Sequence, residues 1–240
     1  MPADPDPELR RAESLDEELL EAESLDIETY LTDEVRLRRI ADELRDGFAA
    51  LSHIGKAVSI FGSARTTRDH PEYARAREVA QRLGEAGFSI ITGGGPGIME
   101  AANRGATDAG VPSIGLDIEL PHEQAMNEWV DLPLTFHYFF ARKVMFVRYA
   151  SAFVVLPGGF GTLDELFEAA TLRQTRKIRH FPIVLLESAY WQGLVDWLRG
   201  PVLAGGKIEP HDVERLCVTD DLEQMLALIE AADHRRPRAA

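Results

Sequence analysis

The sequence predicts an α/β fold: a doubly wound, Rossmann-like parallel sheet with helices on both faces, in a single domain with an acidic N-terminal extension. Short apolar runs alternate with amphipathic segments over residues 55–232, an alternation typical of a parallel sheet covered on both faces. Glycine clusters follow several of these runs, as in sheets that bind ligands at the carboxyl ends of their strands. The chain has 240 residues and is 45% hydrophobic, which is enough for one sizeable core.

The two ends of the chain are predicted to lie outside this domain. Residues 1–28 carry eleven acidic side chains against two arginines, and the pentapeptide AESLD occurs twice in them. We predict a disordered or conditionally helical tail there, with a partner-binding helix as the alternative. In residues 29–54, apolar positions from Leu37 to Phe48 recur at steps of three and four, which predicts an amphipathic helix packed on the domain. Residues 233–240 are expected to form a C-terminal tail.

The elements of the domain follow in order. Short β-rich runs predict strands at residues 57–61, 88–92, 113–118, 152–156, 182–186 and 216–219, with 132–136 as a further candidate. Helical spacing of apolar residues predicts helices at 71–86, 98–109, 139–151, 162–175, 189–199 and 221–231. For the first helix, Asp69 or His70 can cap the N-terminus, Pro71 suits the first turn and Gly87 ends it.

Charge and composition exclude several function classes. The formal net charge is −14, and the clustered basic face that duplex nucleic acid requires is not evident. A local pocket can still bind a small anion. The sequence has no apolar run of eighteen residues and begins with an acidic, proline-rich segment, so we expect no membrane partner, no secretory signal and a cytoplasmic location. Cys217 is the single cysteine, so we expect no internal disulfide and no metal site.

Two glycine clusters, Gly93–Gly97 and Gly158–Gly161, each stand between a predicted strand and a predicted helix. Glycine lets backbone N–H groups approach an anion, and a helix N-terminus adds partial positive charge. Both loops can therefore hold phosphate, although either could simply be a tight turn. Ile98 replaces the third glycine of the dinucleotide fingerprint, and no GxxxxGK[ST] motif occurs. The pattern therefore favours a nucleoside monophosphate over NAD or ATP.

Four segments carry a family resemblance. They are LPGGFGTLDE at residues 156–165, FGSAR at 61–65, GGGPGIMEAANRGA at 93–106 and FFARKVMF at 139–146. The first resembles the PGGxGTxxE signature of the Lonely-guy (LOG) family, the cytokinin-activating phosphoribohydrolases, and the chain looks most like the longer bacterial branch. The resemblance covers about residues 55–200. It implies hydrolysis of the N-glycosidic bond of AMP or an N6-prenylated AMP, a cytokinin riboside monophosphate, giving free base and ribose 5-phosphate.

The resemblance also implies which residues act. Glu165 and Arg142 would be the catalytic pair, and no cofactor or metal is expected. Breaking an N-glycosidic bond develops oxocarbenium character on the ribose, which a carboxylate can stabilise while it orients or deprotonates water. An arginine can hold the phosphate or a ribose hydroxyl. The expected substrate- and phosphate-binding residues are Gly62, Ser63, Arg65, Gly94, Gly95, Gly97, Glu123, Lys143, Gly158, Gly159, Phe160, Gly161 and Thr162.

Structural alternatives remain open at these positions. Thr162 to Glu165 also has the spacing of a capping box, in which Glu165 would satisfy a backbone N–H. Arg142 could be a solvated surface cation. The aromatic residues between Phe136 and Phe140 are interpreted as core or dimer interface rather than as a platform for a base.

The sequence also leads to expectations about the oligomer and about alternative functions. The resemblance implies a homodimer or a hexamer, with a site completed by both subunits. The alternative function is a non-catalytic protein that binds or carries a nucleotide or the molybdenum cofactor. Relatives are often labelled lysine decarboxylases, but a pyridoxal-phosphate enzyme needs a Schiff-base lysine. None of the four lysines, Lys56, Lys143, Lys177 and Lys207, has a convincing sequence setting for that role.

Overall fold

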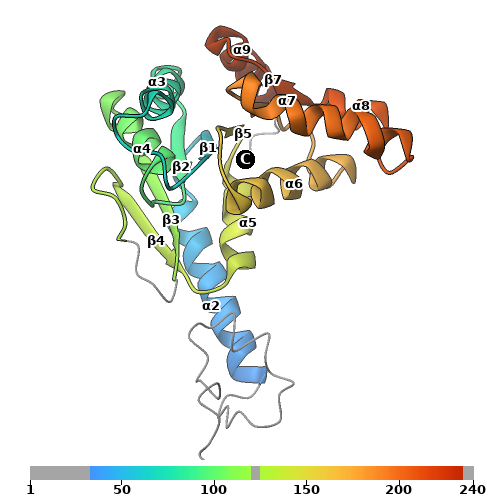
Figure 1. Ribbon diagram of the computed structural model, residues 1–240. Helices are drawn as coiled ribbons and strands as arrows, with labels where there is room; N and C mark the ends of the chain where they lie inside the picture. Colours follow the sequence, from blue (N-terminus) through green and yellow to red (C-terminus); the bar gives the residue numbers. More distant parts are fainter. Residues whose placement is uncertain (1–32, 120–124, 235–240) are drawn as a thin grey trace, which may run out of the picture.

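The computed structural model describes residues 33–119 and 125–234 and contains a single parallel sheet with the order β4-β3-β2-β1-β5-β6-β7 (Figure 1). Every neighbouring pair of strands is parallel. The predicted fold class and all seven predicted strands are confirmed. The strands are β1 (Ala57–Phe61), β2 (Ser89–Thr92), β3 (Ser113–Ile118), β4 (Leu132–Phe136), β5 (Ala152–Val155), β6 (Ile183–Leu185) and β7 (Leu216–Val218).

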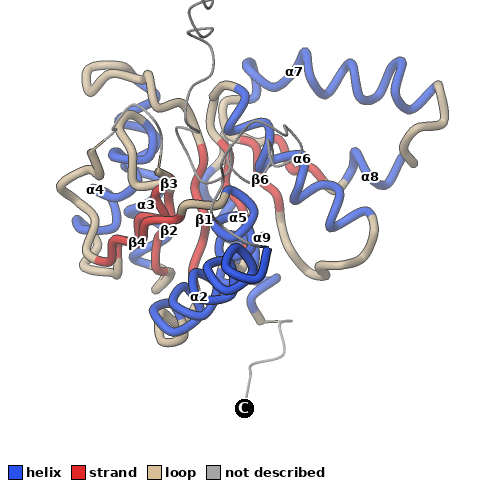
Figure 2. The backbone as a smooth tube through the Cα atoms, turned by 90° about the horizontal axis from the view of Figure 1, so that it is seen from below, coloured by secondary structure: helices blue, strands red, loops and turns tan. Residues whose placement is uncertain are grey.

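Helices cover both faces of the sheet (Figure 2). One buried cluster contains apolar residues of α3, α4 and α9, and a second contains residues of α2, α5 and α6. Side chains of β1 alternate between the two clusters, as the pleat of a strand requires. The helices are α2 (Asp33–Leu51), α3 (Pro71–Glu85), α4 (Ile98–Asp108), α5 (Phe139–Tyr149), α6 (Phe160–Gln174), α7 (Ser188–Trp197), α8 (Pro210–Glu214) and α9 (Leu222–Asp233), with a π-helical turn η1 (Leu198–Val202) after α7.

The strand order reverses between β1 and β5. From β1 the chain adds β2, β3 and β4 on one side, and then returns to place β5, β6 and β7 on the other. The loops that follow β1, β2 and β5 are joined at this point, because Ser63 N–H donates to Pro157 O at 2.9 Å and Ile98 N–H donates to Ser63 O at 3.0 Å. A reversal of this kind opens a crevice at the carboxyl ends of the strands, where ligands bind in doubly wound folds.

Several boundaries differ from the prediction. Helix α6 begins at Phe160, two residues before the predicted start, and α8 was not predicted. The predicted helix 189–199 continues into η1. His70, rather than Asp69, caps α3, because its Nδ1 accepts from Glu72 N–H at 3.3 Å. The predicted tail 1–28, the first residues of the predicted segment 29–54 and the last six residues of the chain lie outside the described residues.

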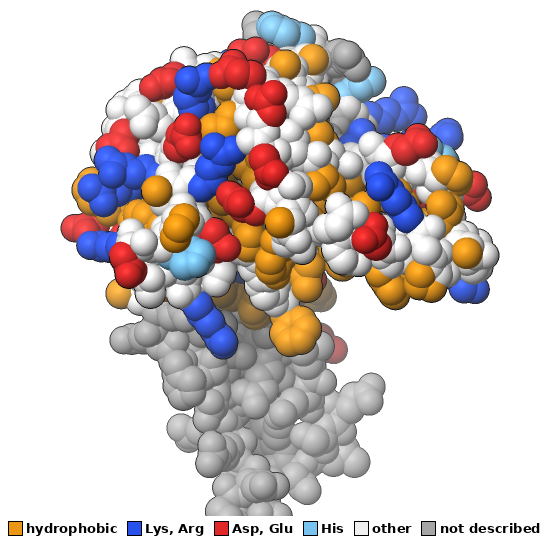
Figure 3. Space-filling model, turned by 45° about the horizontal axis from the view of Figure 1, so that its top comes forward, with side chains coloured by type: hydrophobic (Ala, Val, Ile, Leu, Met, Phe, Trp, Pro, Cys, Tyr) orange, Lys and Arg blue, Asp and Glu red, His pale blue; other side chains and the backbone are white. Residues whose placement is uncertain are grey.

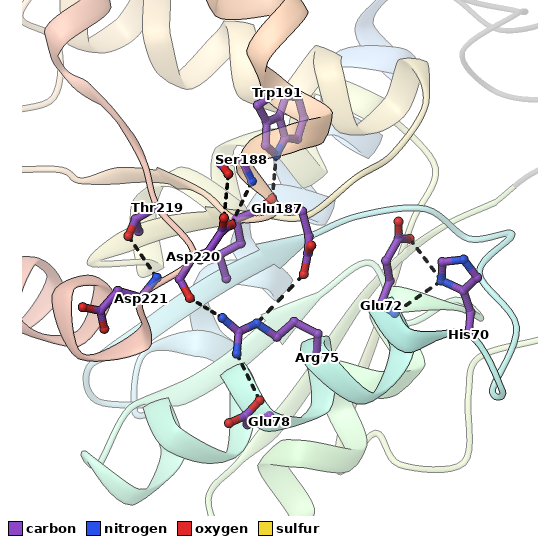
Figure 4. Close-up of polar contacts among 11 residues, drawn as sticks. His70, Glu72, Arg75, Glu78, Glu187, Ser188, Trp191, Thr219, Asp220 and Asp221 are labelled. Atoms are coloured by element: carbon purple, nitrogen blue, oxygen red, sulfur yellow. Dashed lines mark hydrogen bonds and ion pairs between the residues drawn. The ribbon is translucent and has the colours of Figure 1, made fainter.

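A polar cluster fixes the helices beside the carboxyl ends of β6 and β7 (Figure 4). Asp220, which follows β7, accepts from Ser188 N–H at 2.8 Å and so satisfies the N-terminus of α7. Arg75 of α3 donates to the Asp220 backbone oxygen and lies 4.0 Å from Glu187. The cluster thus joins α3 to the β6–α7 and β7–α9 connections.

The described helices include no candidate for a membrane span, since none combines the necessary length with sufficient apolar character. On the face shown in Figure 3, charged side chains of both signs are intermixed, while hydrophobic side chains gather along the lower edge.

Candidate active site

A cavity of about 700 Å³ opens at the carboxyl ends of the strands. Its walls come from the loops after β1, β2 and β5, the end of β3, and the helices α5 and α6. The volume is in the range of small-molecule sites. Ten of the predicted site residues line it: Gly62, Ser63, Arg65, Gly95, Arg142, Gly159, Phe160, Gly161, Thr162 and Glu165.

Other predicted residues shape the loops without lining this cavity. Gly97 has φ +70°, and a Cβ there would lie 2.4 Å from Ser63 O. A Cβ on Gly158 would lie 2.1 Å from Thr162 Oγ1. Gly94 has φ +74°, and its N–H donates to Thr92 Oγ1 at 2.9 Å. Glycine is needed at these positions for backbone conformation and close packing. Glu123 lies outside the described residues.

The loop after β2 is held by a residue that the sequence did not reveal. Asn127 Nδ2 lies within hydrogen-bond distance of Gly94 O (2.9 Å), Gly95 O (3.0 Å) and Asn103 Oδ1 (2.9 Å). Asn103 is fully buried, and its Oδ1 also accepts from Thr92 Oγ1 at 2.7 Å. This network fixes the glycine loop against α4 and turns its carbonyl groups toward Asn127.

Glu165 is buried in α6 with only 3% of its surface exposed. Its Oε1 lies 3.4 Å from Lys143 Nζ, while its Oε2 is buried and has no hydrogen-bond partner. Burial raises the pKa of Glu165 to about 7, against the opposing charges of Lys143 and Arg142. Because burial disfavours the ionised form, this carboxyl group exchanges a proton near neutral pH.

The capping-box alternative for Glu165 is wrong. The N-cap of α6 is Gly159, without a side-chain hydrogen bond, and the helix begins at Phe160. Glu165 therefore stands in the second turn, too far along the helix to satisfy the free N–H groups of its start. Thr162 is already inside the helix. The burial of this carboxylate needs another explanation than capping.

Arg142 lies on α5, half-buried beside Glu165. Its Nε is buried without a hydrogen-bond partner. Its guanidinium carbon is 5.3 Å from the ring centre of Phe139 and 5.5 Å from that of Phe146, within the range of cation–π contact. Burial lowers the pKa of Arg142, while Glu165 and Asp117 act in the opposite direction. The alternative of a solvated surface cation is wrong.

Lys143 contacts three acids of α6, including Glu165, and does not itself line the cavity. Its Nζ lies 2.9 Å from Asp164, 2.9 Å from Glu168 and 3.4 Å from Glu165. Burial acts to lower the pKa of Lys143, but the hydrogen bonds to Asp164 and Glu168 outweigh it, and the pKa is raised. Lys143 is therefore held protonated and does not line the cavity. A Schiff-base lysine must lose its proton to act as a nucleophile, so Lys143 does not fit that chemistry.

Sequence reasoning also missed Asp117. It stands near the carboxyl end of β3 and lines the cavity. Burial raises its pKa, and the charge of Arg142 opposes this shift. Its strand-end position was the available signal, but a single acid carries no motif. Of the aromatic residues interpreted as core or dimer interface, Phe136 and Tyr138 are buried, while Phe139 and Phe140 are exposed (41% and 39%). Phe139 also lines the cavity.

Fold and cavity together define a Rossmann-like α/β protein with glycine loops, an arginine and a buried acid converging on one pocket. Comparison with known families identifies the family within this class. The family model described as "Possible lysine decarboxylase" matches residues 99–229. The chain belongs to this family, the LOG family, as its motifs predicted.

Two similar proteins are named cytokinin riboside 5′-monophosphate phosphoribohydrolase. The chain is 32% identical over 166 residues to the cytokinin riboside 5′-monophosphate phosphoribohydrolase of Mycobacterium tuberculosis, covering 65% of this chain and 86% of the relative. It is 27% identical to the protein of the same name from Rhodococcoides fascians, covering 73% and 90%.

Solved structures confirm the fold. The molybdenum cofactor carrier protein of Chlamydomonas reinhardtii superposes with a TM-score of 0.54 at 21% identity, covering 75% of this chain and 99% of the carrier. The molybdenum cofactor binding protein of Rippkaea orientalis gives a TM-score of 0.53 at 23% identity, covering 73% and 94%. At this identity the likeness concerns the fold alone.

Proposed function

We propose that the protein hydrolyses the N-glycosidic bond of a nucleoside 5′-monophosphate, AMP or an N6-prenylated AMP, to free base and ribose 5-phosphate. One observation carries the proposal: Glu165 lines the cavity, yet its buried Oε2 has no hydrogen-bond partner. A buried carboxylate oxygen without a hydrogen-bond partner costs stability, and such costs are concentrated at functional sites. The names of the relatives support the same reaction.

The glycine loops are suited to the phosphate. Gly159 and Gly161 line the cavity at the start of α6, and Gly95 lines it just before α4. Free N–H groups at the start of a helix and its partial positive charge favour an anion. In our proposal these loops hold the 5′-phosphate, while Arg142 binds a phosphate oxygen or a ribose hydroxyl through its unpaired Nε–H.

In our proposal the fixed sugar places its reacting carbon, C1′, beside the Glu165 carboxylate. The bond between C1′ and the base nitrogen breaks with its electron pair on the nitrogen, and positive charge develops on the ribose. The ionised Glu165 stabilises that charge and accepts a proton from water, whose oxygen bonds to C1′. The proton then passes to the departing base. A pKa of about 7 suits Glu165 to accept and return a proton at neutral pH.

A carrier function is the second candidate. The structural neighbours named as molybdenum cofactor carrier and binding proteins share the fold. A carrier needs loops that hold a phosphate, but it gains nothing from a buried acid whose pKa is near 7. The unpartnered Oε2 of Glu165 and the relatives' names therefore favour the hydrolase.

Assembly into a homodimer is part of the proposal. Phe160 lines the cavity with 93% of its surface exposed. Phe140 and Val144 of α5 and Phe167 of α6 are also exposed. Exposed apolar groups of this kind mark contact surfaces, and a second copy covering Phe160 would close the pocket. Light scattering on the purified protein should give twice the monomer mass or a higher multiple, and Phe160→Ser should shift it toward the monomer. A monomeric wild type would refute the assembly.

Product analysis tests the reaction. Purified protein is incubated with AMP and with isopentenyladenosine 5′-monophosphate, and base and ribose 5-phosphate are separated by chromatography. Wild type should release both products, Glu165→Gln should release neither, and the ratio of rates identifies the preferred base. Glu168→Gln is the matched control, because Glu168 lies one turn further along α6 and also contacts Lys143 without lining the cavity. Nucleotide binding without release by wild type would favour the carrier.

A further inference from the structure

A second cavity of about 530 Å³ lies at the opposite end of the sheet. Phe181 and Pro182, just before β6, form part of its wall, so it opens near the amino end of that strand. The end of α6, the helices α8 and α9 and the edge strand β7 provide the rest. These elements lie together on one side of the molecule (Figure 1). The candidate active site uses the carboxyl ends of the strands, so the two cavities are separate.

Arginine and histidine side chains line this second cavity. Arg173, His180, His211 and Arg215 line it, and Glu214 is the acidic residue in its lining. The segment 173–180 contains three arginines, one lysine and one histidine and no acid, in a chain with 40 acidic and 26 basic residues. Basic charge is therefore concentrated here against the net charge of the protein.

The guanidinium groups of Arg173 and Arg215 both belong to the lining of the second cavity, in which Glu214 is the one acidic residue among those described. Arg173 is half-buried, and its Nη1 donates to the Arg215 backbone oxygen at 2.7 Å. Burial lowers the pKa of Arg173, and so does the charge of Arg215; no described carboxylate contributes to this shift. Arg215 Nη1 lies 3.4 Å from Asp212 Oδ1, but Asp212 also accepts from Gln174 at 2.8 Å. An anion between the two arginines would relieve their repulsion.

We propose that this cavity, the Arg173–Arg215 cavity, binds the phosphate group of a phosphorylated small molecule. Guanidinium groups match phosphate oxygens in pairs and stay charged when half-buried. The volume exceeds that of a bare phosphate, which leaves room for an organic group against Phe181, Leu228 and Ala232. The site is independent of the proposed hydrolysis, because it shares no residue with the cavity that contains Glu165.

The acidic residues 1–28 are the rival occupant. They carry eleven acids against two arginines, a charge opposite to that of the basic segment 173–180. A pocket of about 530 Å³ lined by two arginines suits a compact phosphate better than a segment of 28 residues, because this volume is in the range of small-molecule sites. A variant that lacks residues 1–28 separates the two occupants.

Calorimetry with inorganic pyrophosphate and with glucose 6-phosphate tests the proposal on the full chain. The two probes distinguish a free inorganic anion from a sugar phosphate. Wild type should bind at least one of them, and Arg173→Gln and Arg215→Gln should each weaken that binding at least tenfold. Arg179→Gln is the matched control, because Arg179 is exposed in the same segment and does not line the cavity. It should change the affinity less than threefold.

Three results would overturn the proposal. They are absence of binding by wild type, binding that Arg142→Gln abolishes while Arg173→Gln does not, and binding that appears only after residues 1–28 are removed. The last result would assign the cavity to the acidic segment. Thermal unfolding of each variant verifies that it is folded. If Arg173→Gln does not fold, the loss of binding is measured with Arg215→Gln instead. Loss of nucleotide hydrolysis in a separate assay would leave this test intact.

Discussion

Two buried glutamates stand near the starts of the two helices that follow glycine loops, and they differ in how their charge is satisfied. Glu100 of α4 is 8% exposed and accepts from Tyr73 Oη at 2.7 Å and from Arg68 Nε at 2.6 Å. Glu165 of α6 is 3% exposed, with one oxygen 3.4 Å from Lys143 and the other without a hydrogen-bond partner.

The difference distinguishes an acid that stabilises the fold from an acid suited to catalysis. Tyr73 of α3 and Arg68 of the loop before α3 both donate to Oε1 of Glu100, so this carboxylate ties α4 to that part of the fold. The Oε2 of Glu165 has no hydrogen-bond partner and lies at the wall of a cavity. A substrate or a water molecule in that cavity can provide the missing contact. Burial alone therefore does not identify the functional acid. The buried Oε2 of Glu43 also has no hydrogen-bond partner, but Glu43 does not line the cavity that the glycine loops, Arg142 and Glu165 share.

The largest expected effect is on catalysis. Glu165→Gln keeps the shape of the side chain but cannot stabilise positive charge or accept a proton, so kcat should fall at least a thousandfold, about 4 kcal/mol of transition-state stabilisation. Glu100→Gln should retain kcat within about tenfold. Steady-state kinetics on both variants measures the contrast. Equal losses in the two variants would remove the distinction between the two acids.

The next effect concerns stability. Glu100→Ala leaves the buried Tyr73 hydroxyl without its acceptor and should lower the free energy of unfolding by about 3 kcal/mol. Urea denaturation monitored by circular dichroism measures it. An unchanged midpoint would mean that Glu100 does not tie α4 to α3.

A smaller effect is expected in the pH profile. Because the pKa of Glu165 is raised to about 7, its ionised form is lost as the pH falls below that value. The value of kcat/KM should therefore decrease about tenfold per pH unit below the pKa and level off above it. Rates from pH 5 to 9 give the profile. A flat or inverted limb between pH 5 and 7 would show that ionised Glu165 is not required.

Much of this arrangement could be predicted from the sequence. All seven strands and the glycine loops follow from local patterns, because hydrophobic periodicity and turn residues act over a few positions. The catalytic roles of Arg142 and Glu165 were implied by the family resemblance and stay a prediction. The start of α6 was misplaced because Thr162 has the local chemistry of a cap, whereas the fold begins the helix at Phe160.

Long-range contacts could not be predicted. Asn127 reaches Gly94 across 33 positions, and Lys143 of α5 pairs with acids of α6. Asp117 lines the cavity only because β3 lies two strands from β1. The distinction between Glu100 and Glu165 depends on such contacts as well, since both are acids near the start of a helix in the sequence. Only the assembled fold shows that a buried oxygen of Glu165 lies at the cavity without a hydrogen-bond partner.

The central claim is that Glu165 is buried for chemistry at the expense of stability, and its pH dependence tests this most directly. The pKa is raised from 4.5 to about 7 by folding, so the unfolded state releases this proton first and the wild type loses stability as the pH rises between those values.

Urea denaturation of wild type and Glu165→Gln at pH 5 and at pH 8 is the measurement. The account predicts that Glu165→Gln is more stable than wild type at pH 8, by up to about 3 kcal/mol, and that most of this gain is lost at pH 5. A variant less stable than wild type at pH 8 would show that the Glu165 carboxylate holds the fold together, and would contradict the account.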